Sequence, residues 1–240
     1  TGQQAGLFGG PLFTLLKALT AIQLAEQVSS RHGVPAVPVF WVEAEDHDWA
    51  EVKSCTVLDG ELGPHAVAIG DPAGAQQEPV ARLCLDSSIE EALAVLRSQL
   101  PTTEFTESLL EQLGRVYQPG VGMATAFATW LDTVLGPSGL VVYDASDPAA
   151  KPLVAQLFSR ELSRPGHTAR LATEAGTALV AAGYNAQVTP GADAVALFDL
   201  TSGRRPLRWT DGAFQIDGTR LPQDEAVRSA ERSPERFSPN

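Results

Sequence analysis

Apolar residues follow helical spacing near the start of the chain and then give way to a continuous apolar run. Between residues 11 and 30 the spacing predicts an amphipathic helix, whose apolar stripe comprises Leu12, Leu15, Leu16, Leu19 and Ile22. The run Val34–Val42 (VPAVPVFWV) has the length and composition of a strand that is buried on both faces of a parallel sheet. Because a helix followed by a buried strand is half of a βαβ unit, we expect the first strand of that unit to lie upstream of Thr1.

Helical and strand patterns alternate along the rest of the chain. Helices are expected at Ser87–Leu100, Thr103–Leu113, Val121–Leu135, Pro148–Leu162, Thr168–Ala182 and Gln223–Arg232, and strands at Gly139–Asp144, Ala194–Leu200, Leu207–Trp209 and Ala213–Ile216. Residues 51–86 differ, since short apolar stretches are separated there by glycines, which predicts a small β-rich insertion. The alternation predicts an α/β fold with a doubly wound, mostly parallel sheet, built from residues 1–50 and 87–240 around the connecting insertion.

Composition narrows the classes of partner. The 240-residue chain has a formal net charge of −12 and an isoelectric point near 4.7, which argues against nucleic acid and anionic membrane surfaces as partners. It contains no run of about 18 apolar residues that would span a membrane. Cys55 and Cys84 lack metal-ligand spacing and are too few for a disulfide framework, so we expect a reducing, cytoplasmic location.

A glycine-rich segment, Thr1–Pro11, stands directly before the first predicted helix. Ligands of doubly wound sheets bind at the carboxyl ends of strands, and the amino terminus of a helix attracts anions. The candidates for substrate or phosphate binding are therefore Thr1, Gly2, Gln3, Gln4, Gly6, Gly9, Gly10 and, one helical turn further on, Lys17. The spacing matches neither a Walker loop nor a dinucleotide fingerprint, so a glycine-rich turn beside a solvated lysine is the alternative.

An acidic segment, Glu43–Asp48 (EAEDHD), follows the predicted buried strand. It places several carboxylates around one imidazole, and the candidate catalytic residues are Glu45, Asp46, His47 and Asp48. One interpretation is general acid–base catalysis combined with binding of a substrate amine. A divalent-metal site made by Asp46, His47 and Asp48 is a second, and an ordinary acidic loop with helix caps is a third.

Two further candidates follow the predicted strand Gly139–Asp144. Asp144 ends that strand, at a third strand-end position. Lys151 lies in the first turn of the next predicted helix, where a cation opposes the helix dipole and would gain from a bound anion. We therefore add both residues to the candidates for substrate or phosphate binding.

Five stretches together resemble one known family. They read TGQQAGLFGGPLFTLLKALTAI, VPVFWVEAEDHDWAEV, GLVVYDASDPAAK, GYNAQV and PERFSPN, in this order from end to end of the chain. They look like the cysteine ligases of bacillithiol biosynthesis, and the combination of TGQQ-GLF-GP with W-EDHD is specific to that family. Gly9 stands where the family commonly has Thr.

The resemblance implies a Rossmann-like core, similar to that of class I aminoacyl-tRNA synthetases, in an enzyme that joins cysteine to glucosaminyl malate. It also implies a homodimer formed through a C-terminal coiled coil, which we do not expect within this chain. Amide formation needs activation of the cysteine carboxylate, and ATP with Mg is the expected activator, which a synthetase-like core would suit. Two alternatives are a metal-dependent hydrolase or transferase centred on Asp46, His47 and Asp48, and a substrate-binding scaffold half without activity of its own.

Overall fold

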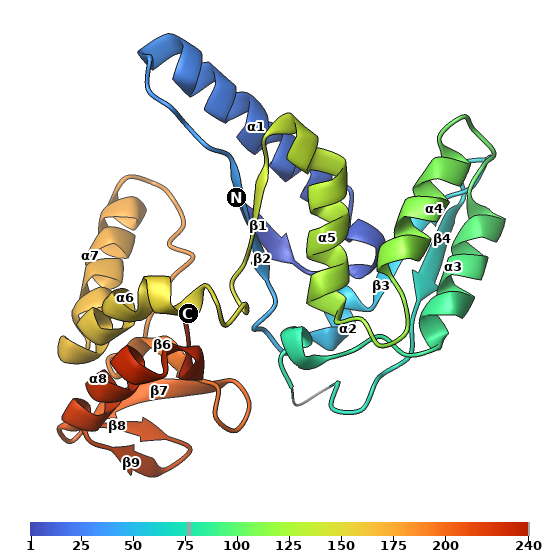
Figure 1. Cartoon of the computed structure of the whole chain (residues 1–240). Helices are drawn as coiled ribbons and strands as arrows, with labels where there is room; N and C mark the ends of the chain where they lie inside the picture. The colour runs from blue at the N-terminus through green and yellow to red at the C-terminus, as the bar shows by residue number, and fades with distance from the viewer. Residues whose placement is uncertain (76–77, 240) are drawn as a thin grey trace. The chain divides into compact units, whose positions relative to one another are not determined.

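A computed structural model describes residues 1–75 and 78–239 of the chain (Figure 1). The chain folds as two compact units, Thr1–Ser146 and Asp147–Asn240. The boundary between them falls inside the range 87–240, which the sequence pattern assigned to one core. Each unit has its own cluster of buried apolar side chains, so each is described by itself.

The first unit is built on a parallel sheet. Its strands β1 (Gly2–Gln4), β2 (Val39–Glu43) and β5 (Val141–Asp144) lie in the order β1-β2-β5. The register pairs Gln4 with Glu43 and Val42 with Asp144, so the carboxyl ends of all three strands meet at one edge. This confirms the α/β prediction. The expectation of a first strand upstream of Thr1 is wrong, because Gly2–Gln4 form it, and a strand of Gly and two Gln carries no apolar pattern.

Helix α1 (Phe13–His32) connects β1 to β2, and the structure corrects its predicted apolar stripe. The buried residues are Thr14, Ala18, Ile22 and Ala25, whereas Leu12, Leu16 and Leu19 are exposed. Small side chains at Ala18 and Ala25 let the helix backbone approach the core closely. Gly33 ends the helix in a left-handed conformation with φ of 63°, and its N–H donates to the Ser29 carbonyl.

Strand β2 is shorter and less deeply buried than the run VPAVPVFWV predicts. It begins at Val39, because Pro35 and Pro38 have no N–H to donate to a neighbouring strand. Phe40 and Val42 are buried, but Val39 is exposed, as is its partner Val141 on β5. One face of the sheet therefore carries the core of this unit, while apolar side chains on the other face reach its surface.

The predicted β-rich insertion is present as a hairpin of β3 (Ser54–Leu58) and β4 (Pro64–Ala68). It follows the short helix α2 (Trp49–Val52) and precedes a single turn at Val80–Arg82. The helices of this unit then follow as α3 (Ser88–Gln99), α4 (Thr106–Val116) and α5 (Met123–Leu135). α5 is apolar on most sides, and the buried side chains of Phe127 and Leu131 belong to the same core as Phe40.

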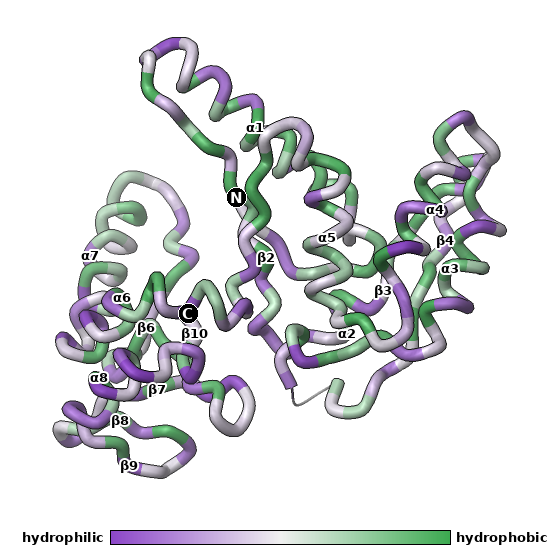
Figure 2. The backbone as a smooth tube through the Cα atoms, in the orientation of Figure 1, coloured by the Kyte–Doolittle hydropathy of each residue, from purple (hydrophilic) through white to green (hydrophobic). Residues whose placement is uncertain are grey.

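The second unit has an antiparallel sheet in the order β10-β6-β7-β8-β9. Its strands are β6 (Ala194–Asp199), β7 (Arg205–Thr210), β8 (Ala213–Ile216), β9 (Thr219–Leu221) and β10 (Phe237–Pro239), and its helices are α6 (Lys151–Ser163), α7 (His167–Ala181) and α8 (Gln223–Arg232). α8 is largely hydrophilic, as Figure 2 shows, and it buries only Ala226 and Ala230. None of the helices in the described part of the chain is both long and apolar enough to cross a membrane.

Candidate active site

The acidic segment leaves the end of β2 and is held in place by its backbone. The N–H groups of Val80 and Ala81 donate to the carbonyls of Asp46 and Ala44, each at 2.8 Å. Asp48 then begins α2 as its N-cap, since its side chain accepts a hydrogen bond from the N–H of Glu51 at 3.2 Å. The segment is therefore a fixed connection between a strand and a helix.

Asp46 is the centre of a small hydrogen-bonded group. Its Oδ1 accepts from the N–H of His47 at 2.7 Å and lies 3.4 Å from His47 Nδ1, and its Oδ2 accepts from Gln4 Nε2 at 3.2 Å. The side chain of His47 is 59% exposed, so its ring can meet a ligand. Glu45, by contrast, is 2% exposed. The four predicted catalytic residues therefore separate into a buried Glu45 and three side chains at a surface cavity.

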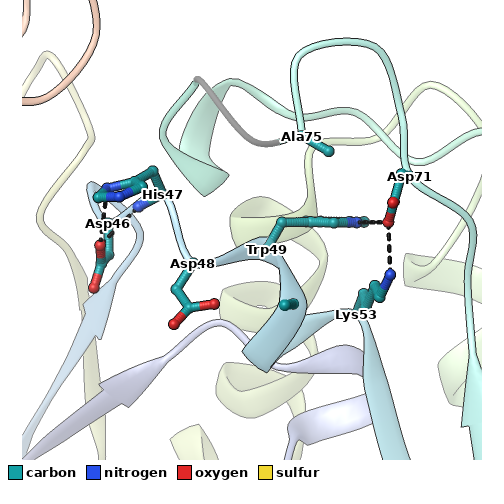
Figure 3. A pocket seen from close by; sticks show the side chains of 8 residues that line it. Asp46, His47, Asp48, Trp49, Lys53, Asp71 and Ala75 are labelled. Atoms are coloured by element: carbon teal, nitrogen blue, oxygen red, sulfur yellow. Dashed lines mark hydrogen bonds and ion pairs between the residues drawn. The ribbon is translucent and has the colours of Figure 1, made fainter.

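That cavity, which we name the acidic cavity, has a volume of about 450 Å³ and is lined by Asp46, His47, Asp48, Trp49, Ala50, Lys53, Asp71 and Ala75. Figure 3 shows His47 and Asp46 at one end, Lys53 and Asp71 at the other, and the Trp49 ring between them. One Asp71 oxygen accepts from Lys53 Nζ at 2.7 Å and from Trp49 Nε1 at 3.1 Å. The hydrogen bond from Lys53 is the main cause of the lowered pKa of Asp71.

Sequence reasoning missed the Lys53–Asp71 end of the acidic cavity. Lys53 is one of only three lysines in the chain, and that scarcity was a usable signal. Asp71 gave none, because it stands between Gly70 and Pro72 and has the appearance of an ordinary turn residue. Only the pairing of β3 with β4 brings the two side chains together.

The glycine-rich segment packs against α5 and against Tyr117, the residue that follows α4. The N–H of Gly9 donates to the Gly6 carbonyl and to the Tyr117 hydroxyl, both at 3.2 Å. Gly9 has φ of 95°, and a Cβ there would lie 2.4 Å from the ring of Trp130, so only glycine fits. Burial raises the pKa of Tyr117. The conformation of this loop is thus fixed from within the protein.

Lys17 reaches back to the same segment, as the direction of helical side chains predicts. Its Nζ donates to Gln3 Oε1 at 2.9 Å and to the Gly2 carbonyl at 3.3 Å. The N–H of Gly10 donates to the Leu7 carbonyl. The amides of Gly9 and Gly10 and the ammonium of Lys17 thus have partners within the segment itself. Whether they also contact a phosphate or a substrate carboxylate stays a prediction.

A second cavity lies between the glycine-rich segment and the hairpin. We name it the amide cavity; its volume is about 350 Å³ and its lining residues are Gln3, Gln4, Gly6, Pro11, Leu12, Phe13, Glu51, Val52, Ser54, Cys55 and Thr56. Burial raises the pKa of the Cys55 thiol to about 11. Gln4 lines this cavity while its Nε2 reaches Asp46 in the acidic cavity, so the two cavities share a wall.

The other predicted residues lie outside both cavities. The Thr1 carbonyl accepts from the N–H of Trp41 and extends the pairing of β1 with β2. Asp144 Oδ1 accepts from the N–H and the hydroxyl of Ser146. Lys151 belongs to the second unit, where it is 2% exposed and donates to the Phe237 carbonyl at 3.0 Å. Whether any of these residues contacts a substrate stays a prediction.

A metal site was one interpretation of the acidic segment. Over residues 1–75 and 78–239, no three side chains of His, Cys, Asp or Glu are grouped so that they could hold a metal ion. Within those residues, Asp46, His47 and Asp48 therefore do not form a ready-made site for magnesium or another metal.

The first unit thus defines an α/β domain of the Rossmann type, with polar cavities at the carboxyl ends of its strands. The family model described as Bacillithiol biosynthesis BshC, N-terminal Rossmann-like domain, matches residues 1–240, and the chain belongs to this family. The resemblance and the Rossmann-like fold predicted from the sequence are both confirmed.

Individual relatives agree with this assignment. A protein of Salinibacter ruber is 37% identical, one of Koribacter versatilis 32% and one of Symbiobacterium thermophilum 33%, and each carries the name "Putative cysteine ligase BshC". The matches cover 100% of this chain but 44%, 44% and 46% of the relatives, so the chain spans less than half of their length.

Proposed function

We propose that this chain is the Rossmann-like domain of a ligase that joins cysteine to glucosaminyl malate through an amide bond in bacillithiol biosynthesis. The observation that carries the proposal is the acidic cavity at the carboxyl end of β2, in a chain of the BshC family. It offers an imidazole beside carboxylates, which is the chemistry needed to bind an ammonium group and remove its proton. The names of the relatives support ligation of cysteine as the reaction.

The reaction needs an electrophile and a nucleophile. A carboxylate is a poor electrophile, so the cysteine carboxylate must first be activated, and ATP with Mg would supply the leaving group. The glucosamine ammonium must lose one proton before its nitrogen can attack. The nitrogen then forms a bond to the carboxyl carbon, the bond from that carbon to the leaving group breaks, and the nitrogen gives up a second proton.

His47 is the candidate base for the first proton, that of the glucosamine ammonium, while the second proton is released to solvent water. Its ring is exposed to the acidic cavity, and Asp46 lies 3.4 Å from Nδ1, which suits it to orient the ring and to stabilise the imidazolium. Gln4 in turn holds the other oxygen of Asp46. Asp48 lines the same cavity and can accept a hydrogen bond from the ammonium, whereas the buried Glu45 is suited to a supporting role.

The test is cysteine-dependent amide formation from glucosaminyl malate, measured by mass spectrometry with and without ATP. We expect His47→Ala to lower the rate about 100-fold or more, the usual contribution of a general base, and added imidazole to restore part of it. His32→Ala is the matched control, since His32 is exposed at the end of α1. A normal rate in His47→Ala would exclude His47 as the base.

A substrate-binding half without activity of its own is a second candidate. It is favoured by the length of the chain, which spans 44% of the Salinibacter ruber relative. The same assay separates the two candidates when the relative is run alongside as a full-length comparison. Binding of glucosaminyl malate by this chain without amide formation, together with activity of the relative, would support the scaffold function.

A further inference from the structure

The amide cavity has no part in the proton transfers assigned to His47. It is enclosed by the end of β1, the start of α1, helix α2 and strand β3, all within the first unit. Glu51 is the one charged side chain among its described lining residues. The remaining polar groups are amides, hydroxyls and a thiol, and Leu12, Phe13 and Val52 supply apolar surface. This composition suits a small ligand with a polar head and a compact, uncharged side chain.

A buried oxygen shows what the polar head must provide. Gln4 Oε1 is buried and has no hydrogen-bond partner in the part of the chain that the structure describes. Because Gln4 Nε2 donates to Asp46, this oxygen is the unpaired end of an amide whose side chain lines the cavity. An unsatisfied buried acceptor is costly, so a small rotation of the Gln4 amide toward a ligand that brings an N–H donor would remove that cost. With Glu51 on the same lining, the site favours a protonated amine.

Gln3 offers the opposite kind of group. Its Oε1 is taken by Lys17 Nζ at 2.9 Å, so Nε2 is the donor end of this amide, and the ammonium stands directly behind it. Amide N–H groups backed by a positive charge suit a carboxylate. Donors for a carboxylate and acceptors for an ammonium thus occur on neighbouring residues of β1, as recognition of an α-amino acid requires.

The apolar part of the cavity carries Cys55. Its thiol stays protonated at neutral pH, because burial raises its pKa to about 11. It is therefore a small, polarisable and uncharged neighbour, which suits contact with another thiol without attack on it.

We propose that the amide cavity is the subsite for the amino-acid substrate, an α-amino acid with a small uncharged side chain such as cysteine, held by Gln3, Gln4 and Glu51. This inference rests on the proposed ligase function. The shared wall supports it: a two-substrate condensation needs two adjoining subsites, and Gln4 joins this cavity to Asp46 beside the candidate base.

The experiment is titration of the chain with L-cysteine under reducing conditions by calorimetry, which needs no turnover. Thr56→Phe introduces a large side chain at an exposed lining position on β3, where an aromatic residue is well tolerated. Leu58→Phe is the control, because Leu58 is exposed two residues further along the same strand and outside the lining. We expect Thr56→Phe to weaken cysteine binding about tenfold or more and Leu58→Phe to leave it within about twofold.

A second variant tests the ammonium contact. Glu51→Gln should weaken L-cysteine binding but not binding of 3-mercaptopropionate, which has the thiol and carboxylate without the amine. His32→Ala should leave cysteine affinity unchanged, because His32 is exposed at the end of α1 and outside the lining. Circular dichroism and melting temperatures of each variant confirm that it is folded.

The proposal is overturned if wild-type chain does not bind L-cysteine at roughly millimolar concentration, or if Thr56→Phe binds it as the wild type does. Its failure is distinguishable from failure of the ligase function. Cysteine binding that depends on Thr56 and Glu51, without any amide formation in the full-length relative, would retain the subsite and reject the reaction.

Discussion

Cys55 and Cys84 differ in ways that chemical modification can measure. Burial raises the pKa of Cys55 to about 11, whereas Cys84 is exposed. At about pH 8 only about one Cys55 side chain in a thousand is a thiolate, and the thiolate is the reactive form. We expect iodoacetamide to label Cys84 first, and labelling of Cys55 to accelerate as the pH rises toward 11. Peptide mass spectrometry of timed samples gives both rates, and equal rates near neutral pH would contradict this.

Asp71 makes a second residue-scale prediction, through the pH dependence of stability. Its pKa is lowered in the folded protein, chiefly by the hydrogen bond from Lys53. A carboxyl group with a lowered pKa stabilises the folded protein when the pH is above the unfolded pKa of 3.8. This contribution is lost as the pH falls through the pKa of the folded state. Asp71→Asn should therefore melt at a lower temperature than wild type at about pH 7, and the difference should shrink by about pH 3.

Melting curves of both proteins across this range provide the measurement. Lys53→Met is the companion variant, because it removes the donor of the hydrogen bond to Asp71. When Asp71→Asn is made in Lys53→Met, the pH-dependent difference in melting temperature between the two proteins should therefore disappear. If the difference in melting temperature between wild type and Asp71→Asn stays constant from neutral to acidic pH, the ion pair is not the cause of that difference.

At the scale of elements, the glycine-rich loop depends on its packing against α5. Gly9→Ala adds a Cβ 2.4 Å from the Trp130 ring, at a φ of 95°. Gly139→Ala is the matched control, since Gly139 has φ of 85° with nothing within 4 Å of the added atom. We expect Gly139→Ala to cost about 1 kcal/mol of unfolding free energy, and Gly9→Ala about 1–3 kcal/mol more.

Urea denaturation of the two variants and wild type isolates the difference. Gly139→Ala loses only the free energy that a positive φ costs an alanine. The additional loss of unfolding free energy in Gly9→Ala therefore measures the clash of the new Cβ with Trp130 of α5. Equal losses in the two variants would mean that the loop can move away from Trp130.

Sequence periodicity predicted helices and strands well where a single face of the helix or strand packs against the core. α8 (Gln223–Arg232) and the hairpin in residues 51–86 are present as expected. The predicted buried face of α1 was wrong, because Ala18 and Ala25 are buried in the core whereas the larger Leu16 and Leu19 are exposed. A helix with apolar residues on more than one side does not reveal which side is buried until its neighbours are known.

The candidate site was predictable only in part. Residues that follow a strand directly, such as Asp46 and His47, could be assigned from the strand-end rule. The pairing of Lys53 with Asp71 could not be predicted, because 18 residues separate them in sequence and the β3–β4 hairpin brings them together. The amide cavity was hidden for the same reason, since its walls come from β1, α1, α2 and β3.

At the scale of the whole molecule, both cavities lie within the first unit. Every described residue that lines them comes from the first 75 positions of the chain, and the unit has its own core. A protein truncated after Ser146 should therefore unfold cooperatively, and it should keep the affinity of the whole chain for L-cysteine within about twofold. Calorimetry and thermal melting test this, and loss of binding in a truncated protein that is still folded would show that the second unit contributes to the subsite.

The contact between Gly9 and Trp130 also bears on how the family has diverged. Because the indole fills the space of a side chain at position 9, the two positions cannot change independently. Relatives with Thr at the position of Gly9 should carry a residue smaller than Trp at the position of Trp130, together with a loop that turns without a positive φ. The pair is therefore expected to covary among aligned relatives.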